Sequence, residues 1–362
     1  MEDLNIIIPV KNENKNITRV LDSFFYEVKS KFIVTLCYDN KNDNTLPEVK
    51  NYDRIKSVKV KFLKNKYGNY GINGAIKTAF QNNRAKSVLI YPGDDFFNAD
   101  ESIKPCCAAV PVSADGIYAL WLAAEGTDPN KRILYLHGGG YILGSLRGYQ
   151  SLGSHLSSAT GASVLLIDYR LAPEDKFPAG IEDVKTAFTW MLENGPDGSS
   201  PADKTYIAGD SAGGGLALAS TLAMRDEGLA LPGGVIALSP WTELEPTSTS
   251  FEENNDTDPF LSREGITGMA DAYVNSQEEK KNPLASPLFA SFKDFPKLLI
   301  QVGSREMLLD DSKRVAQKAK EEGCQVDLQV WEDMVHVWQG YAPFLPEALE
   351  ALESIGNFIN KD

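Results

Sequence analysis

Short apolar runs alternate along the chain with stretches in which apolar side chains have helical spacing. In the first hundred residues, runs of strand length lie at residues 4–10, 32–37, 57–63 and 87–90. Helical spacing follows two of them, at about residues 17–26 and 71–80. Such alternation predicts a parallel sheet whose binding edge lies at the carboxyl ends of its strands. We therefore expect a truncated Rossmann-like α/β segment here.

From residue 107 on, the same pattern is longer and clearer. Eight apolar runs predict strands at residues 108–112, 117–124, 133–136, 163–169, 205–208, 235–238, 298–302 and 326–331. Helices are expected at about residues 181–192, 214–227, 312–322 and 346–359. Eight strands with helices between them favour a doubly wound, mostly parallel α/β sheet with helices on both faces.

Charge and length divide the chain at the point where the pattern changes. The 362 residues are enough for two domains. Residues 1–104 contain 17 Lys+Arg and 13 Asp+Glu, a net charge of +4. Of the chain's 36 basic and 50 acidic residues, 19 and 37 remain for the rest, a net charge of −18. This break predicts domains at residues 1–104 and 105–362.

Composition also narrows the class of partner. The overall charge of −14 argues against nucleic acid, because phosphate binding needs a basic face. No apolar run approaches the ~20 residues of a membrane span, and the first residues lack the pattern of a secretory signal. Four cysteines without metal-ligand spacing fit a reducing cytoplasm. We expect a cytoplasmic protein that acts on a small molecule without a membrane partner, and homo-oligomer formation stays open.

The stretch Gly209-Asp210-Ser211-Ala212-Gly213 carries the strongest chemical signal. It matches G-x-S-x-G and lies between an apolar strand and an Ala/Leu-rich helix, which is the context that a nucleophile elbow requires. The sharp turn needs small residues at positions 209 and 213, because side chains there would collide with neighbouring backbone. We interpret Ser211 as a nucleophile; the alternative is that Ser211 only caps the helix.

A serine nucleophile needs a base, and the chain offers few. Of its three histidines, His137 and His155 precede Ser211, whereas His336 follows the last strand after a short turn. In the fold that uses this elbow the order is serine, acid, histidine, so His336 is the expected base. The acid should follow the strand at 298–302. Glu306 is favoured over Asp310, because Asp310 and its neighbour precede a helix expected to start near residue 312 and can serve its N-terminus.

The segment His137-Gly138-Gly139-Gly140 directly follows another strand. A tetrahedral oxyanion needs backbone N–H donors with no Cβ in the way, and consecutive glycines provide them. We expect Gly138, Gly139 and Ala212 to form the oxyanion hole.

These motifs resemble the hormone-sensitive lipase family of esterases, the bacterial family IV carboxylesterases. The similar stretches appear in family order over about residues 107–360: HGGGYILGS, DYRLAPEDKFPA, GDSAGGGLALA, SPWTEL, DPFLSREG, ASPLFA and DMVHVWQ. The resemblance implies an α/β-hydrolase fold and hydrolysis of short-chain carboxylic esters without metal or organic cofactor. It also implies that the segment from Asp168 to Glu174 braces the oxyanion loop and the core.

The chain departs from this family in the residues that cover the active site. Family members carry N-terminal cap helices where this chain has residues 1–104, while a second cap contribution is present at about 242–295. We therefore expect an unusually open acyl pocket, lined by Tyr141, Trp241, Phe260 and Trp338.

Residues 1–104 resemble a different family, the nucleotide-binding half of family 2 glycosyltransferases. IIIPVKNENKNI is similar to their opening strand and loop, Asp39 falls where they hold the nucleotide, and Gly93-Asp94-Asp95 is similar to their metal-and-diphosphate motif. The half with the acceptor site and the catalytic base should follow Asp95 and is absent, so the aspartate pair is interpreted as a remnant. Two alternatives to a serine esterase remain: a metal-dependent nucleotide-sugar transferase and a non-catalytic fusion.

Overall fold

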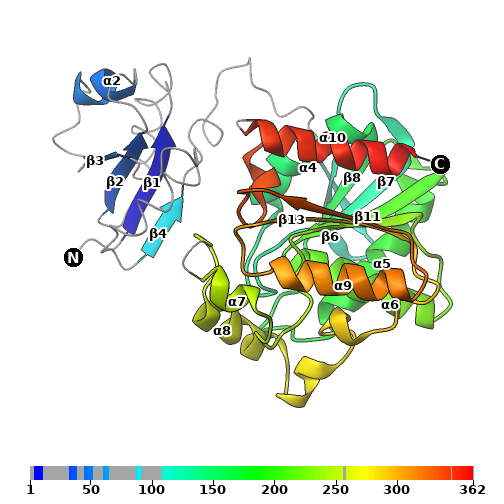
Figure 1. Cartoon of the computed structure of the whole chain (residues 1–362). Helices are drawn as coiled ribbons and strands as arrows, with labels where there is room; N and C mark the ends of the chain where they lie inside the picture. The colour runs from blue at the N-terminus through cyan, green and yellow to red at the C-terminus, as the bar shows by residue number, and fades with distance from the viewer. Residues whose placement is uncertain are drawn as a thin grey trace. The chain divides into compact units, whose positions relative to one another are not determined.

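A computed structural model describes residues 4–10, 32–38, 45–51, 60–64, 87–90, 107 and 109–361, apart from 256, 257 and 344. Its contacts divide the chain into two units, Met1–Lys104 and Pro105–Asp362 (Figure 1).

The first unit contains a four-stranded parallel sheet with the strand order β3-β2-β1-β4. Its described elements are β1 (Leu4–Val10), β2 (Phe32–Tyr38), α2 (Thr45–Asn51), β3 (Val60–Lys64) and β4 (Ser87–Ile90). The predicted parallel arrangement of strands is confirmed, and α2 was not predicted. The helices expected near 17–26 and 71–80, and the three aspartates Asp39, Asp94 and Asp95, lie outside the described residues.

The second unit is built on an eight-stranded sheet with the order β14-β13-β12-β11-β7-β8-β6-β5. Only β6 runs antiparallel to its neighbours, β5 and β8; the other pairings are parallel. The strands are β5 (Ala109–Ala114), β6 (Ile117–Leu122), β7 (Asp128–Leu136), β8 (Ala162–Ile167), β11 (Lys204–Asp210), β12 (Gly234–Leu238), β13 (Lys297–Gly303) and β14 (Val326–Trp331). The predicted eight-stranded, mostly parallel sheet is confirmed.

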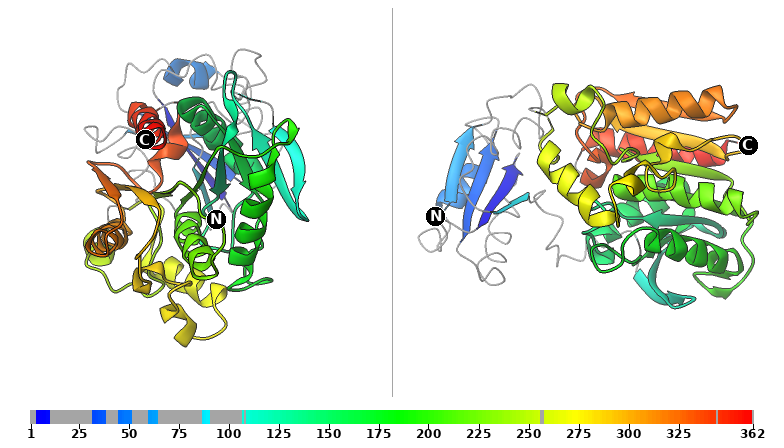
Figure 2. Two further views of the ribbon diagram at one scale, coloured as in Figure 1. Left: turned by 90° about the vertical axis from the view of Figure 1, so that its right-hand side faces the viewer. Right: turned by 90° about the horizontal axis from the view of Figure 1, so that it is seen from below.

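Helices cover both faces of this sheet, as Figures 1 and 2 show. On one face, α4 (Leu146–Thr160) and α10 (Pro346–Asn360) pack on a core that includes Leu156 and Ile355. On the other face lie α5 (Ala179–Glu193), α6 (Ala212–Asp226) and α9 (Leu309–Glu321). Both cores are closed to solvent, so the strand ends are held by packing on two sides.

Helix α4 is an element that the hydrophobic pattern does not predict. Its buried positions include small residues such as Gly153, Ser154 and Ser157, so its apolar periodicity is weak. A Cβ on Gly153 would lie 2.6 Å from Leu122 Cδ1, which explains why a small residue is needed where the helix meets the sheet. The N-terminus is signalled instead by Ser145, whose side chain accepts a hydrogen bond from Gly148 N.

An insert between β12 and β13 contains the short helix α7 (Ser250–Glu253), helix α8 (Arg263–Tyr273), and the 3-10 turns Glu278–Lys281 and Pro287–Phe289. The stretch DPFLS leads into α8, and Ser262 caps this helix by accepting a hydrogen bond from Gly265 N. After β13, the helix predicted at about residues 312–322 is confirmed as α9, which begins three residues earlier, at Leu309. A minor hairpin joins Asn194–Gly195 to Gly198–Ser199, and a further 3-10 turn covers Trp338–Tyr341. Within the described ranges, every helix is too short or too polar to cross a membrane.

Candidate active site

Parallel strands bring the predicted catalytic residues to one edge of the sheet. Ser211 directly follows β11, Glu306 comes three residues after β13, and His336 follows β14 after a short turn. β12 lies between β11 and β13, and β14 is the next strand beyond β13. Because the carboxyl ends of these strands lie at the same edge, residues far apart in sequence come within contact distance.

The turn that carries Ser211 is an elbow between β11 and α6. Ser211 adopts φ 55° and ψ −120°, a backbone conformation that L-residues rarely occupy. A Cβ on Gly209 would lie 2.3 Å from Gly213 O, and one on Gly213 would lie 2.1 Å from Leu136 O, as the sequence argument requires. Although Ser211 stands at the start of α6, its side chain makes no capping hydrogen bond. The alternative reading of Ser211 as a helix cap therefore has no support.

The three side chains form a continuous line of hydrogen bonds. His336 Nε2 lies 2.9 Å from Ser211 Oγ, and His336 Nδ1 lies 2.7 Å from Glu306 Oε2. Ser211 and His336 are each 9% exposed, and Glu306 is fully buried. Asp310, the alternative acid, instead accepts a hydrogen bond from Ser250 N, and no hydrogen bond joins it to His336 in the described part of the chain.

The other oxygen of Glu306 is held just as firmly. Glu306 Oε1 accepts hydrogen bonds from Ser239 Oγ at 2.8 Å and from Gly303 N at 2.6 Å. Ser239 Oγ also accepts one from Val337 N, the residue after His336. This serine was missed from the sequence, although it opens the family-like stretch SPWTEL directly after β12.

The surroundings of His336 favour its protonated form. Burial lowers the pKa of His336, but the hydrogen bond to Glu306 and the negative charges of Glu306, Asp258 and Asp210 outweigh this effect and raise the pKa above its ordinary value. A base with a raised pKa accepts a proton more readily, provided that the solution pH keeps it neutral beforehand.

The glycine loop after β7 corrects one prediction. Gly138 N donates to Asp210 Oδ1 at 3.1 Å and to Tyr149 Oη at 3.0 Å, so it is engaged inside the protein and is not an oxyanion donor. Gly139 and Gly140 have φ values of +121° and +64°, and their N–H groups donate no hydrogen bond within the described part of the chain. The N–H of Ala212 belongs to the first turn of α6, where backbone donors have no partner within the helix. Gly139 and Ala212, two of the three predicted donors, therefore keep available N–H groups, and Gly140 offers another in place of Gly138.

Buried polar contacts hold this loop in shape. Asp210 accepts hydrogen bonds from Tyr135 Oη and Tyr149 Oη as well as from Gly138 N. Burial raises the pKa of Asp210, and the two tyrosine hydrogen bonds oppose that rise. Tyr169 Oη donates to His137 O at 2.6 Å, so the segment from Asp168 to Glu174 does contact the oxyanion loop as the resemblance implied.

Comparison with known proteins gives the family. A model described as the alpha/beta hydrolase fold matches residues 133–340, more than half of the chain. The chain belongs to the α/β-hydrolase fold family.

Proteins similar to this hydrolase are named esterases or acetyl-hydrolases. It is 39% identical over 241 residues to an acetyl-hydrolase of Streptomyces hygroscopicus, which covers 67% of this chain and 79% of the relative. Among solved structures, an esterase from the bacterial hormone-sensitive lipase family is 38% identical with a TM-score of 0.67, covering 80% of this chain and 90% of that one. The structure of EstE5 soaked with p-nitrophenyl butyrate also has a TM-score of 0.67. EstE5 is 42% identical to this chain, and the match covers 72% of this chain and 86% of EstE5. The resemblance to the hormone-sensitive lipase family is thus confirmed.

Three of the four predicted pocket residues of the hydrolase are core residues. Trp338 has no exposed surface and packs against Trp331, and its Nε1 donates to Glu347 O. Tyr141 and Trp241 are 3% and 2% exposed, with Tyr141 stacked on Tyr273 at 3.8 Å between ring centroids. The burial of these three rings argues against the predicted contact with substrate. Phe260 is 39% exposed and stays a candidate.

The N-terminal part of the hydrolase chain matches a second family. A model for glycosyl transferase family 2 matches residues 5–167, which begin in β1 and extend past the first unit to the end of β8. The resemblance of residues 1–104 to this family is confirmed, whereas the interpretation of Asp94 and Asp95 as a remnant lies outside the described residues and stays a prediction. Among the residues that the structure describes, no three His, Cys, Asp or Glu side chains are grouped to hold a metal ion.

Proposed function

We propose that this chain is a carboxylesterase that hydrolyses short-chain acyl esters with Ser211 as nucleophile, His336 as base and Glu306 as the acid. The observation that carries the proposal is the line of hydrogen bonds from Ser211 Oγ through both ring nitrogens of His336 to Glu306. Such a line is the arrangement by which a serine hydroxyl, weakly nucleophilic by itself, loses its proton as it attacks.

The geometry supports a two-step reaction. His336 Nε2 takes the proton of Ser211 as Oγ attacks the ester carbonyl, and Glu306 stabilises the imidazolium through Nδ1. His336 then gives that proton to the leaving alcohol, whose bond to the acyl carbon breaks. A water molecule attacks the acyl-enzyme by the same route and releases the carboxylic acid.

The tetrahedral oxyanion needs preorganised donors, and we assign this role to the backbone N–H groups of Gly139, Gly140 and Ala212. Gly140 replaces Gly138 in this set because the Gly138 N–H is already bonded to Asp210 and Tyr149. Each such donor is typically worth ~10²–10³ in rate.

Short acyl groups are supported by the relatives. One relative is named an acetyl-hydrolase, and EstE5 was soaked with a butyrate ester. The unusually open acyl pocket that we expect, because residues 1–104 stand where the family carries N-terminal cap helices, remains a prediction.

The deciding experiment measures hydrolysis of p-nitrophenyl acetate and butyrate by wild type and by Ser211→Ala. We expect turnover by wild type, a loss of roughly 10⁴-fold or more in kcat for the variant, and labelling of wild type alone by a fluorophosphonate. No labelling of folded wild type would favour the non-catalytic fusion. Turnover of a sugar nucleotide that stops on chelation, without ester hydrolysis, would favour the transferase.

A further inference from the structure

One segment of the insert lies along the loop that carries Glu306. Residues 250–258 of the insert and residues 304–310 after β13 are joined by hydrogen bonds from three insert side chains: Ser250, Asn254 and Asp258. We call these three residues the insert clamp.

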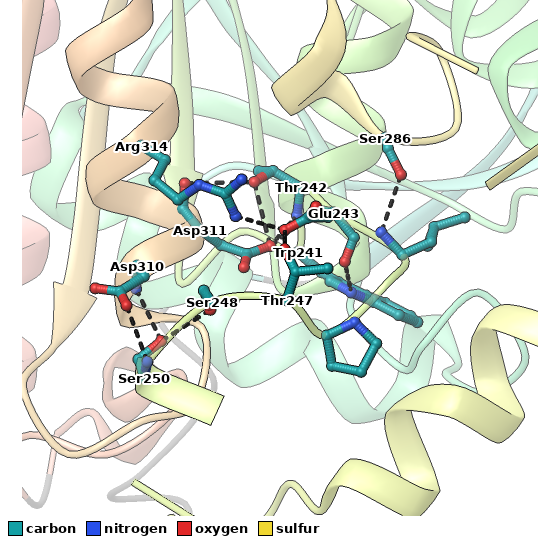
Figure 3. A network of polar contacts seen from close by, with 12 residues as sticks. Trp241, Thr242, Glu243, Thr247, Ser248, Ser250, Ser286, Asp310, Asp311 and Arg314 are labelled. Atoms are coloured by element: carbon teal, nitrogen blue, oxygen red, sulfur yellow. Dashed lines mark hydrogen bonds and ion pairs between the residues drawn. The ribbon is translucent and has the colours of Figure 1, made fainter. Parts of the chain in front are cut away.

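Ser250 holds the far side of the loop. Its Oγ donates to Met307 O at 2.6 Å and accepts from Asp310 N at 3.1 Å, while its backbone N donates to Asp310 Oδ2. Figure 3 shows this paired contact between Ser250 and Asp310 at the base of the insert. Ser250 is only 2% exposed, so water does not compete for these bonds.

Asn254 and Asp258 hold the main chain at Glu306 itself. Asn254 Nδ2 donates to Glu306 O at 2.8 Å. Asp258 Oδ2 accepts from Met307 N at 2.9 Å, while its Oδ1 accepts from Phe260 N and Leu261 N and so anchors the turn before α8. The peptide group that follows the catalytic acid is therefore bound at both its carbonyl oxygen and its N–H by the insert.

Asp258 also acts through its charge. It is 7% exposed, and it is one of three carboxylates, with Glu306 and Asp210, whose negative charges favour the protonated form of His336. Burial raises the pKa of Asp258, and the charge of His336 and three backbone N–H donors oppose that rise.

We propose that the insert clamp is a set of positioning residues for the triad acid: Ser250, Asn254 and Asp258 fix the backbone around Glu306 so that Oε2 stays on His336 Nδ1. The insert is then part of the support of the catalytic acid. This inference rests on the proposed function.

Two variants test it, each with a matched control. Asp258→Asn removes a negative charge and puts an amide N–H₂ group in place of one of the two oxygens that accept backbone hydrogen bonds. Its control, Glu264→Gln, removes a charge from an exposed position of the same insert. Ser250→Ala removes a buried hydroxyl that makes two bonds to the loop of Glu306 and one to Ser248 Oγ. Its control, Ser163→Ala, removes a fully buried hydroxyl that has no partner in the described part of the chain.

The readouts are kcat and KM for p-nitrophenyl butyrate, normalised to the sites titrated by a fluorophosphonate, and the pH dependence of kcat/KM. We expect kcat to fall about tenfold to a hundredfold in Asp258→Asn and Ser250→Ala, with KM within about twofold, because a displaced catalytic group slows the chemical step more than binding. The acidic limb should move to lower pH in Asp258→Asn and stay in place in Ser250→Ala. The controls should keep the wild-type values.

A kcat within about twofold of wild type in both clamp variants would overturn the inference. So would a loss that disappears after normalisation to titrated sites, since it would then reflect unfolded protein. If Asp258→Asn does not fold, Ser250→Ala decides by the same criterion. Failure of the proposed function is distinguishable, because wild type itself would then hydrolyse no ester.

Discussion

Glu306 and Asp311 are two fully buried carboxylates only five residues apart. The regions around them differ in how completely they supply hydrogen-bond partners to the carboxylate oxygens. Around Glu306, both carboxylate oxygens are bonded, one to Ser239 and Gly303 and the other to His336. Around Asp311, one oxygen accepts from Thr242 and Glu243, while Oδ1 has no hydrogen-bond partner in the described part of the chain. Figure 3 shows Asp311 facing the start of the insert at Thr242 and Glu243.

This difference in hydrogen bonding predicts different roles for the two carboxylates. A buried charge with a complete set of partners can be used for chemistry, because its geometry and ionisation are fixed. A buried charge with an unpaired oxygen costs stability, because burial penalises the ionised form. Burial raises the pKa of Asp311 to about 7, against the hydrogen bonds from Thr242 and Glu243. We therefore expect Glu306 to control the rate and Asp311 to control the stability.

The largest expected effect is on the rate at Glu306. Glu306→Gln keeps the shape but removes the charge that stabilises the imidazolium and fixes its tautomer, so kcat should fall by about 10³–10⁴-fold. The measurement is steady-state hydrolysis of p-nitrophenyl butyrate near pH 8, with circular dichroism to verify folding. A loss below tenfold would mean that another carboxylate supports His336.

The next effect is on stability at Asp311. Below the unfolded pKa of 3.8, both folded and unfolded chains hold this proton and the residue contributes no penalty. As the pH rises toward 7, the unfolded chain ionises while the folded one keeps its proton, so folding becomes less favourable, by at most about 4 kcal/mol. Asp311→Asn removes this pH-dependent loss of stability, because asparagine does not ionise.

Thermal unfolding of wild type and Asp311→Asn at pH 5 and pH 8 measures how much Asp311 lowers the stability of the fold at each pH. We expect the melting temperature of wild type, relative to the variant, to be lower at pH 8 than at pH 5. An unchanged difference would contradict the raised pKa. The opposite trend would mean that ionised Asp311 is stabilised in the fold.

A smaller effect is expected at Ser239, which belongs to the Glu306 region. Ser239→Ala removes one of two donors to Glu306 Oε1 and the acceptor of Val337 N, while Gly303 N stays in place. We expect kcat to fall about tenfold with little change in KM, because a net hydrogen bond to a charged group is worth about 1.5–3 kcal/mol and one donor remains. Wild-type kcat would show that Gly303 alone orients the acid.

The comparison also indicates what sequence can and cannot predict. Ser211, His336 and Glu306 were predicted because each has a local signature: an elbow between two glycines, a histidine after the last strand, and a carboxylate just after β13. The strands of the sheet were predicted because they are nearly continuous apolar runs.

Residues whose role depends on contacts from distant segments were missed or misassigned. Gly138 looks like its two glycine neighbours until the positions of Tyr149 and Asp210 are known. Trp338 and Trp241 are residue types typical of a substrate pocket, and only their near-complete burial reveals them as core. Ser239 gains its function from Glu306, 67 residues later.

The smallest expected effect is that of Asp311→Asn on the rate: kcat near pH 8 should stay within about twofold of wild type. Within the described residues, the Asp311 carboxylate bonds to Thr242 and Glu243, and none of its hydrogen bonds there reaches Ser211, His336 or Glu306. The measurement is the same butyrate assay as for Glu306→Gln, run at a temperature at which both proteins are folded. A tenfold loss would show that the base of the insert is coupled to the triad, and stability and rate would then not be separable between these two regions.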